Sequence, residues 1–443
     1  MRVPEPIMMD AMKILLMAAA FPALWAAPSY QSEVRPILEK RCVGCHRAGE
    51  IGPMPLGSFA EVRPWAKSIR QAVTRGTMPP WHADAAKSVA FHNDRSLTAA
   101  ERKTIQDWVD TGAPEGKPGG ATVSTARAGG WRLGKPDLIV RVPKMPIPAS
   151  GTIQYTFLVT PTDLPEAKWM AAAEWKIDQR SVVHHINAFV RPKGSSYVAD
   201  APPGQFFVAS KASRGARRPD EREADRRELL LGYEPGYEPI PWGEGRAKLL
   251  PKGADIVFEM HYTANGKAVS DASELGIYFA KSAPRERVLT ITPADSAFAI
   301  PPGDGNFPSS TAATLQRDLT LLSMQPHMHL RGKSYRITAR YPDGRVENLI
   351  DVPKYDFNWQ TTYFLAQPKS LPKGTVLECL AHFDNSPNNR FNPDPSQTVR
   401  WGDQSWEEMN IGFMEVVFPA AADPDVVTLS GTTRPGAAAG TTR

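Results

Sequence analysis

Residues 182–190 have the sequence Val-Val-His-His-Ile-Asn-Ala-Phe-Val, a run of β-branched and aromatic side chains that contains a pair of histidines. Runs of this kind favour β-strands, in which successive side chains point to opposite faces of a sheet. Comparable runs, separated by proline and glycine turns, recur along most of the chain: 137–142, 153–159, 254–262, 275–279, 319–324, 334–341, 375–383 and 410–418. Short strands spaced in this way predict a β-sandwich or a barrel.

The composition agrees with a β-rich chain. The 443 residues include 42 prolines and 33 glycines, which disfavour a mostly helical protein and suit strands joined by turns. The strand pattern extends from 136 to 430, which is too long for one small sandwich of about 100 residues. We therefore expect two all-β sandwich domains of jelly-roll type, at 136–285 and 286–430, and a disordered tail at 431–443.

The part of the chain before the strands has a helical pattern. Apolar residues recur at helical spacing from 59 to 74. Thr98 precedes Glu101 by three residues, which is a capping box and predicts the start of another helix. We expect a small all-α domain at 28–113, followed by a Gly-, Ala- and Pro-rich linker at 114–135.

The sequence Cys42-Val-Gly-Cys45-His46 lies in this helical part and is the attachment pattern of c-type haem. It predicts one covalent haem c, with thioethers from the cysteines and His46 as proximal ligand. Met78 is the candidate sixth ligand. The alternatives to Met78 as sixth ligand are Met54, His82 and His92. The two cysteines could instead form a redox-active pair or half of a zinc site. The region resembles a single-haem cytochrome c domain, so the predicted fold class is multidomain, with a small all-α cytochrome c domain before two all-β sandwiches.

The first residues predict export. Lys13 precedes an apolar run, 14–26, that ends in small residues, so 1–27 is interpreted as a signal peptide and the protein as periplasmic or secreted. An uncleaved anchor and a start at Met12 are the alternatives. No other segment suggests an integral membrane span. The net charge of +5 comes without a basic and aromatic pattern, so no nucleic acid partner is expected.

Six histidines lie beyond the helical part: His184, His185, His261, His327, His329 and His382. In His327-Met-His329 the two imidazoles point to the same face of a strand and form a ready bidentate metal site. The adjacent pair His184-His185 is different, because neighbours on a regular strand point to opposite faces. Both can bind one metal only if the backbone twists or bulges there, or if the strand ends.

The order of these motifs, completed by Trp406-Glu-Glu-Met409-Asn, resembles the copper type II, ascorbate-dependent monooxygenases, the family of peptidylglycine α-hydroxylating monooxygenase and dopamine β-monooxygenase. The resemblance covers about 131–418. It implies two sandwich domains that each hold one copper ion. The first copper would be bound by His184, His185 and His261, and the second, catalytic copper by His327, His329 and Met409. A thioether favours Cu(I); Met414 is the poorer candidate, and His382 matches no ligand position.

The resemblance further implies a copper-dependent monooxygenase that hydroxylates a C–H bond of a small organic substrate with O₂. Electrons would come one at a time from an ascorbate-like reductant or a redox protein, supplied or relayed by the fused haem. Gln325 stands where the peptide-hydroxylating member has a carboxylate-binding Arg, so peptide C-termini are not implied as substrates. The alternatives are a non-catalytic haem and copper electron-transfer or copper-binding protein, and a binding scaffold. No hydrolase motif is present.

Overall fold

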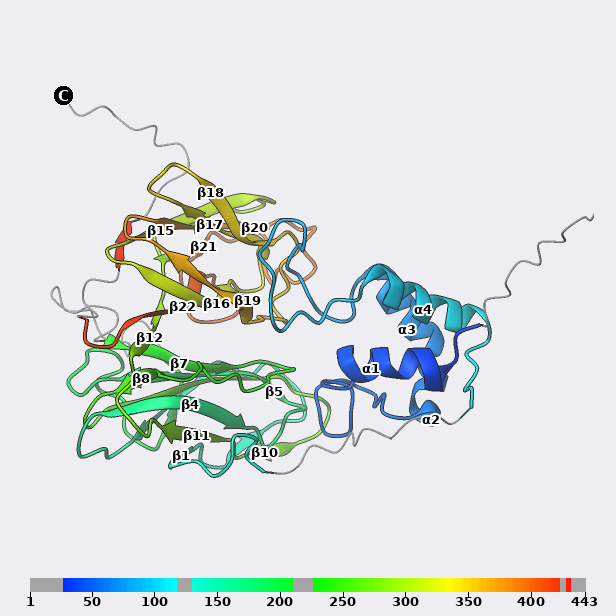
Figure 1. Ribbon diagram of the computed structural model, residues 1–443, viewed down its shortest axis with the longest axis horizontal. Coiled ribbons are helices and arrows are strands. Elements are labelled where there is room, and N and C mark those ends of the chain that lie inside the picture. The colour runs from blue at the N-terminus through cyan, green and yellow to red at the C-terminus, as the bar shows by residue number, and fades with distance from the viewer. Residues whose placement is uncertain (1–26, 118–129, 210–225, 423–427, 432–443) are drawn as a thin grey trace, which may run out of the picture.

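The computed structural model describes residues 27–117, 130–209, 226–422 and 428–431, and Figure 1 shows two stacked β-sandwich halves with a group of short helices at one end. The predicted signal peptide, most of the predicted linker and nearly all of the predicted tail lie outside the described residues. Within the described part of the chain, no helix is both long and apolar enough to cross a membrane.

The largest sheet has nine strands and belongs to both halves. Its order is β1-β11-β4-β8-β12-β22-β16-β19, with β13 paired to β22. The two halves join where β8 and β12 run parallel, with Glu286 opposite Arg246. These strands are β1 Leu138–Arg141, β4 Lys168–Lys176, β8 Arg246–Leu250, β11 Glu274–Phe279, β12 Glu286–Ile291, β13 Ala294–Asp295, β16 Leu319–His327, β19 Tyr363–Leu371 and β22 Asn410–Pro419.

A five-stranded sheet covers each half of the large sheet. The first has the order β6-β3-β9-β5-β7 and the second β18-β17-β20-β15-β23. Two small pairs, β2 with β10 and β14 with β21, complete the fold. The bounds are β2 Met145–Ile147, β3 Thr156–Pro161, β5 Val183–Arg191, β6 Phe206–Phe207, β7 Glu228–Tyr233, β9 Asp255–Tyr262, β10 Val269–Asp271, β14 Ala299–Ile300, β15 Phe307–Leu315, β17 Gly332–Arg340, β18 Val346–Val352, β20 Val376–Phe383, β21 Val399–Arg400 and β23 Thr428–Gly431.

Each half encloses its own apolar core. In the first half, Trp175 of β4 and Phe258 of β9 pack between the two layers, and in the second, Met414 of β22 packs with Ile337 of β17. Each sequence run predicted as a strand coincides with a strand of these layers. The continuous nine-stranded sheet differs from two separate sandwiches, because the β8–β12 pairing makes one sheet serve both cores.

The expected all-α cytochrome c domain at 28–113 is wrong. The α-helices are short: α1 Arg35–Arg41, α2 Phe59–Val62, α3 Ala66–Arg75 and α4 Ala99–Asp110, with one π-helical turn at Tyr30–Val34 and one 3₁₀ turn at Arg63–Trp65. The protein is instead a mainly β-sandwich protein with a small helical segment at one end (Figure 1). The assignment to a haem-bearing cytochrome c, which was made from Cys42-Val-Gly-Cys45-His46 and its expected all-α context, is withdrawn with that domain.

The reason lies in residues 81–93, which were expected inside the helical domain. They form an extended arm that packs on the second sandwich half instead. Val89 donates a backbone hydrogen bond to Leu349 and His92 donates one to Phe364. Trp81 packs edge-on against Tyr363, with ring centroids 4.9 Å apart. The arm therefore extends the β structure and leaves the helices with a small core.

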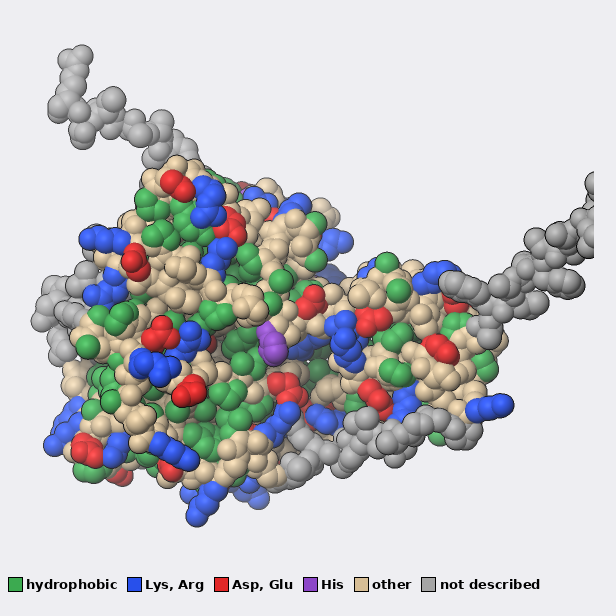
Figure 2. Space-filling model, viewed as in Figure 1, with side chains coloured by type: hydrophobic (Ala, Val, Ile, Leu, Met, Phe, Trp, Pro, Cys, Tyr) green, Lys and Arg blue, Asp and Glu red, His purple; other side chains and the backbone are tan. Residues whose placement is uncertain are grey.

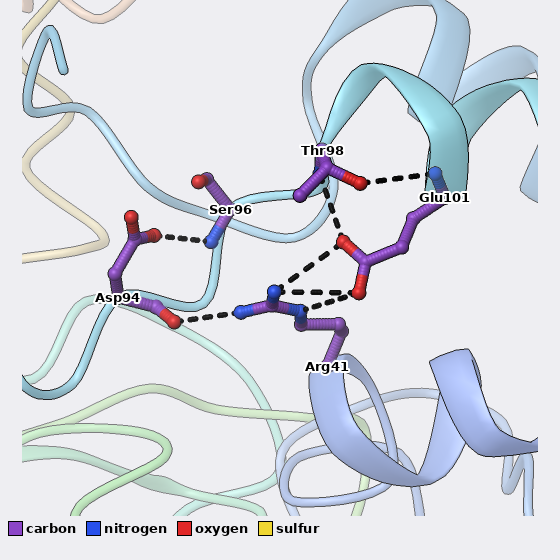
Figure 3. A network of polar contacts seen from close by, with 5 residues as sticks. All are labelled: Arg41, Asp94, Ser96, Thr98 and Glu101. Carbon is purple, nitrogen blue, oxygen red and sulfur yellow. Dashed lines mark hydrogen bonds and ion pairs between the residues drawn. The ribbon is translucent and has the colours of Figure 1, made fainter.

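One feature of the helical segment agrees with the sequence. Thr98 caps α4 by accepting from the backbone N–H of Glu101 at 3.1 Å, and the carboxylate of Glu101 accepts from the backbone N–H of Thr98 at 2.8 Å. Figure 3 shows that Arg41, at the end of α1, also bonds Glu101 and the carbonyl oxygen of Asp94. This network ties the two helices together.

Candidate metal centre

The adjacent histidines of β5 lie at a bulge. Val183 pairs with Tyr262 and His185 pairs with His261, so the register between β5 and β9 shifts at His184. An extra residue in one strand re-aims its side chain. As a result, the Nδ1 atoms of His184 and His185 lie only 3.0 Å apart. This is the irregularity that the two neighbouring imidazoles need in order to face one point.

His261 of β9 completes a group of three. One ring nitrogen from each of His184, His185 and His261 lies within 4.8 Å of the other two. The Nδ1 atom of His261 is buried and has no hydrogen-bond partner in the described structure. Imidazole nitrogens bind transition metals at about 2.0–2.1 Å, so neighbouring ligand atoms around one ion are expected about 3 Å apart. The group, called the first cluster below, therefore fits a bound metal ion.

Burial keeps the first cluster neutral. It lowers the pKa of His184 to about 4 and that of His261 to about 3, in the latter case with help from the neighbouring His184. The pKa of His185 is also well below its usual value, first because of burial and then because of the surrounding histidines. Neutral imidazoles carry the lone pairs that metal binding requires. The cluster is therefore ready to bind a metal at neutral pH without first losing protons.

His327 and His329 form the second cluster with nearly perpendicular rings, whose centroids are 5.1 Å apart. The Nδ1 atom of His327 lies 2.6 Å from Oε1 of Gln360, and that of His329 lies 3.2 Å from the carbonyl oxygen of Glu407. Because a carbonyl oxygen can only accept, each Nδ1 donates its proton. The lone pair then resides on Nε2 of each ring, which is the arrangement that hydrogen-bonded metal ligands show.

Met409 directly precedes β22 and follows Glu407 and Glu408, which both contact His329. In the β16–β22 ladder, Gln325 pairs with Phe413 and His327 with Ile411. The ladder ends at this pair, and the backbone N–H of His329 donates to the side chain of Glu408 at 2.8 Å, so Met409 belongs to the segment that contacts His329. Met409 is buried at 7% exposure. Met414, by contrast, packs in the apolar core of the second half.

A buried carboxylate supports the turn after His327. Glu408 accepts hydrogen bonds from the backbone N–H groups of His329 at 2.8 Å and Arg331 at 2.6 Å. Arg331 is itself buried, and its guanidinium donates to Asn385 and to the carbonyl oxygen of Trp406. These bonds fix the backbone that carries His329 against the segment that carries Met409.

The two clusters lie beside each other. Alternation along the strands explains this: Ile186 and Met260 point into the first core, so His185 and His261 point out of it. Met324 of β16 and Met328, which directly follows that strand, pack in the second core, whereas His327 between them is not part of it. The charges of His327 and His329 contribute to the lowered pKa of His185, which places both within electrostatic reach. The candidate centre is therefore at the interface of the two halves.

Several predicted residues lie elsewhere. Cys42 follows α1, and burial raises the pKa of its thiol to about 12. His46 is buried, and its Nδ1 lies 3.1 Å from the carbonyl oxygen of Met54. His382 on β20 contacts Ser334 at 3.2 Å. The described contacts bring none of these residues to either histidine cluster.

Met78 lies between α3 and the arm, His82 lies at the start of the arm and His92 lies near its end. Met78 comes just after α3, and His82 and His92 belong to 81–93. Burial lowers the pKa of His82, with Asp356 of the second half acting in the opposite direction. His82 therefore faces the second half.

Sequence reasoning missed the residues that surround the clusters. Gln360 and Glu408 hold the second cluster by hydrogen bonds, and the rings of Tyr155 and Phe357 lie against both clusters. These residues belong to separate loops and strand ends, where no periodic pattern marks them. Only the neighbouring sequence of Glu408 and Met409 carried a signal, through the motif that ends at Met409.

A small cavity lies close to the second cluster. Its volume is about 50 Å³, and its lining includes Gln325, Phe413, Glu234 and Trp242. The ring of Phe413 is 5.9 Å from that of His327, and Gln325 donates to the backbone carbonyl of Gln360 at 2.9 Å. The cavity has room for a few water molecules or for a small part of a larger ligand.

Comparisons with known proteins do not assign a family. No protein-family model and no curated protein matches the chain. Among solved structures, T=1 particles derived from infectious bursal virus align at 10% identity over 67% of this chain and 73% of that chain, with a TM-score of 0.18. The Gx strain of infectious bursal disease virus aligns at 10% identity over 67% and 76%, with a TM-score of 0.19. Scores this low carry no conclusion about fold or function.

Proposed function

We propose that the protein is a copper-dependent monooxygenase that hydroxylates a C–H bond of a small organic molecule. One observation carries the proposal. Three histidines converge within 4.8 Å, and a second pair with donating Nδ1 atoms lies beside them near Met409. All-imidazole and imidazole–thioether donor sets suit copper that cycles between two oxidation states.

The first cluster would hold one copper ion. His184, His185 and His261 offer three neutral imidazoles. The second cluster would hold another through Nε2 of His327, Nε2 of His329 and the thioether of Met409. Bound copper would supply one-electron chemistry at both clusters and oxygen binding at the second.

The reaction that such a pair supports consumes two electrons. A substrate C–H group, O₂, two electrons and two protons give a C–OH group and one water molecule. The electrons come from an external one-electron donor. The protein's own contribution is positioning: Gln360 fixes the ring of His327, and Glu408 fixes the backbone of His329. Burial of both histidines excludes water from the reacting centre.

The cavity beside Phe413 is the candidate place for the substrate group that reacts. It is lined by apolar side chains such as Trp242 together with the polar groups of Gln325 and Glu234. A neutral amide at position 325 pairs poorly with a substrate carboxylate, whereas an arginine there would bind it bidentately. We therefore expect substrates without a carboxylate next to the reacting carbon.

Copper stoichiometry on the full chain tests the proposal. After loading with copper and desalting, about two copper ions per chain are expected, because each cluster offers one donor set. His261→Ala and His327→Ala should each lose one. His382→Ala is the matched control, since His382 bonds Ser334 on the far sheet, and it should retain both. Failure of the unmodified chain to bind copper would overturn the proposal.

Oxygen uptake then separates catalysis from mere copper binding. With a one-electron reductant and a mixture of small aromatic and amine substrates, the copper-loaded protein should consume O₂ in proportion to hydroxylated product. His327→Ala should abolish this coupling. Full copper loading without substrate-dependent uptake would indicate a non-catalytic copper protein.

A further inference from the structure

Tyr155, which directly precedes β3, contacts both histidine clusters. Its ring stacks on His261, with centroids 4.5 Å apart and an interplanar angle of 13°. The same ring lies 5.3 Å from His185 and 6.3 Å from His329. One aromatic side chain therefore touches two histidines of the first cluster and one of the second.

Phe357, from the loop before β19, does the same from another direction. Its ring stacks on His184 at 5.5 Å and lies 5.9 Å from both His261 and His329. The backbone carbonyl of Phe357 accepts from Nε2 of Gln360 at 3.2 Å, and Gln360 in turn bonds His327. Phe357 is thus fixed to the second cluster while its ring covers the first.

Tyr155 is anchored across the interface as well. Its backbone N–H donates to Oε1 of Gln404 at 3.3 Å, and Gln404 belongs to the segment that leads to Met409. The backbone N–H of Gln404 donates to the carboxylate of Glu407, whose carbonyl oxygen accepts from His329. A continuous chain of contacts therefore joins the first half to the ligands of the second.

We propose that Tyr155 and Phe357 hold the two clusters together as one paired centre, with Tyr155 as the positioning residue that sets their separation and relative orientation. This inference deepens the proposed function and rests on it for the identity of the metal. The Tyr155 ring lies 4.5 Å from that of His261 and 6.3 Å from that of His329, so it joins the two sites by ring contacts. If both sites held copper, these rings would hold the two ions at a fixed separation.

Magnetic coupling between two Cu(II) ions tests this directly, because dipolar coupling falls steeply with separation. The oxidised, fully loaded chain should show a half-field resonance, the signature of a coupled pair. Tyr155→Phe keeps the ring and should keep this signal. Tyr155→Leu should lose most of it while still binding two copper ions. Two uncoupled Cu(II) signals in the unmodified chain, or an unchanged half-field signal in Tyr155→Leu, would overturn the inference.

Phe157→Leu is the matched control. Phe157 lies two residues after Tyr155, within β3, is fully buried, and packs against Phe207 with ring centroids 5.8 Å apart. The loss of a buried ring there should lower stability as Tyr155→Leu does and leave the half-field signal in place. A similar loss of signal in Phe157→Leu would show that general loosening of the fold, and not the Tyr155 ring, is responsible.

A metal-free measurement distinguishes failure of this inference from failure of the proposed function. In the apo protein, Tyr155→Leu and His329→Ala should have non-additive effects on unfolding, because the residues contact each other across the interface. Phe157→Leu and His329→Ala should be additive. If copper does not bind but the non-additivity is present, the paired arrangement stands and the copper function fails. Additive effects of Tyr155→Leu and His329→Ala would overturn the paired arrangement itself.

Discussion

The carboxylate of Glu408 accepts a hydrogen bond from the backbone N–H of His329 at 2.8 Å, while its other oxygen accepts from the N–H of Arg331 at 2.6 Å. Glu408 is fully buried, which raises its pKa to about 8, although these hydrogen bonds and the Arg331 charge act in the opposite direction. A buried acid is costly to ionise. Its hydrogen bonds to the N–H groups of His329 and Arg331 offset this cost in part and order the backbone of the second cluster.

Replacement of Glu408 by Gln should weaken the second metal site. In Gln an NH₂ group takes the place of one of the two accepting oxygens and cannot accept a hydrogen bond, so one buried backbone N–H is left without a partner, at a cost of about 1–3 kcal/mol in the free energy of unfolding. Copper affinity at the second cluster should fall about 10- to 100-fold, as for other supports of metal ligands. Denaturant unfolding and copper titration measure the two effects. Glu407→Gln, whose carbonyl bond to His329 is preserved, should leave copper affinity unchanged.

Met409→Leu should remove the soft ligand with little change in volume. A swap of Met for Leu costs less than about 1.5 kcal/mol when the shape is preserved. Loss of the thioether should weaken Cu(I) binding at the second cluster by about tenfold or more. Competition with a Cu(I) chelator measures this. Met414→Leu provides the control, because Met414 lies in the apolar core; equal chelator sensitivity of the two variants would exclude Met409 as a ligand.

Local sequence was sufficient to predict the strands, whereas the grouping of the histidines into two metal sites was an expectation from the family resemblance. Runs such as 254–262 and 410–418 became β9 and β22, because alternating side chains match a half-buried sheet. The need for an irregularity at His184-His185 followed from strand geometry alone, and the register shift at His184 is that irregularity. The addition of His261 to this pair was an expectation from the resemblance, and in the structure one ring nitrogen of each of the three histidines lies within 4.8 Å of the other two.

The helical prediction failed where tertiary contacts override local pattern. Thr98 and Glu101 correctly indicated the start of α4. Nothing in 81–93 indicated that Val89 and His92 would bond to strands more than 250 residues away, since such pairing depends on the partner's position. The contact of Tyr155 with His329 was hidden for the same reason: it exists only because two outward-facing sheet surfaces meet.

Thr98→Ala should destabilise α4 and the network drawn in Figure 3. Loss of a Thr N-cap costs about 1 kcal/mol, which corresponds to about fivefold faster opening of the helix. Hydrogen exchange of peptides from 99–110, followed by mass spectrometry, measures the change. Thr104→Ala lies within the same helix, away from its cap. In that variant the amide hydrogens of the helix should exchange at the original rate or more slowly. If exchange became equally faster in Thr98→Ala and Thr104→Ala, the effect would not come from loss of the cap.

Glu234 should make stability depend on pH. Its carboxyl group is buried between the two halves, near the arm, and accepts from the backbone N–H of Thr362 at 3.1 Å. Burial raises its pKa from 4.5 to about 7, despite the opposing effects of the Thr362 bond and the nearby Arg95. Between these two pH values the folded protein therefore binds the proton more tightly than the unfolded chain does.

The direction of the effect follows from proton linkage. Stability falls with rising pH wherever the folded state binds more protons, so the contribution of Glu234 is complete below about pH 4.5 and is lost as the pH rises through about 7. A shift of this size corresponds to a loss of about 3 kcal/mol across the window. Glu234→Gln has no such proton, and its unfolding free energy should fall less between pH 5 and pH 8. Other buried acids, such as Glu408, titrate in both proteins and cancel in the comparison.

Denaturant unfolding at a series of pH values measures the difference between the two proteins. Parallel plots of unfolding free energy against pH would mean that Glu234 ionises in the folded protein as readily as it does in water.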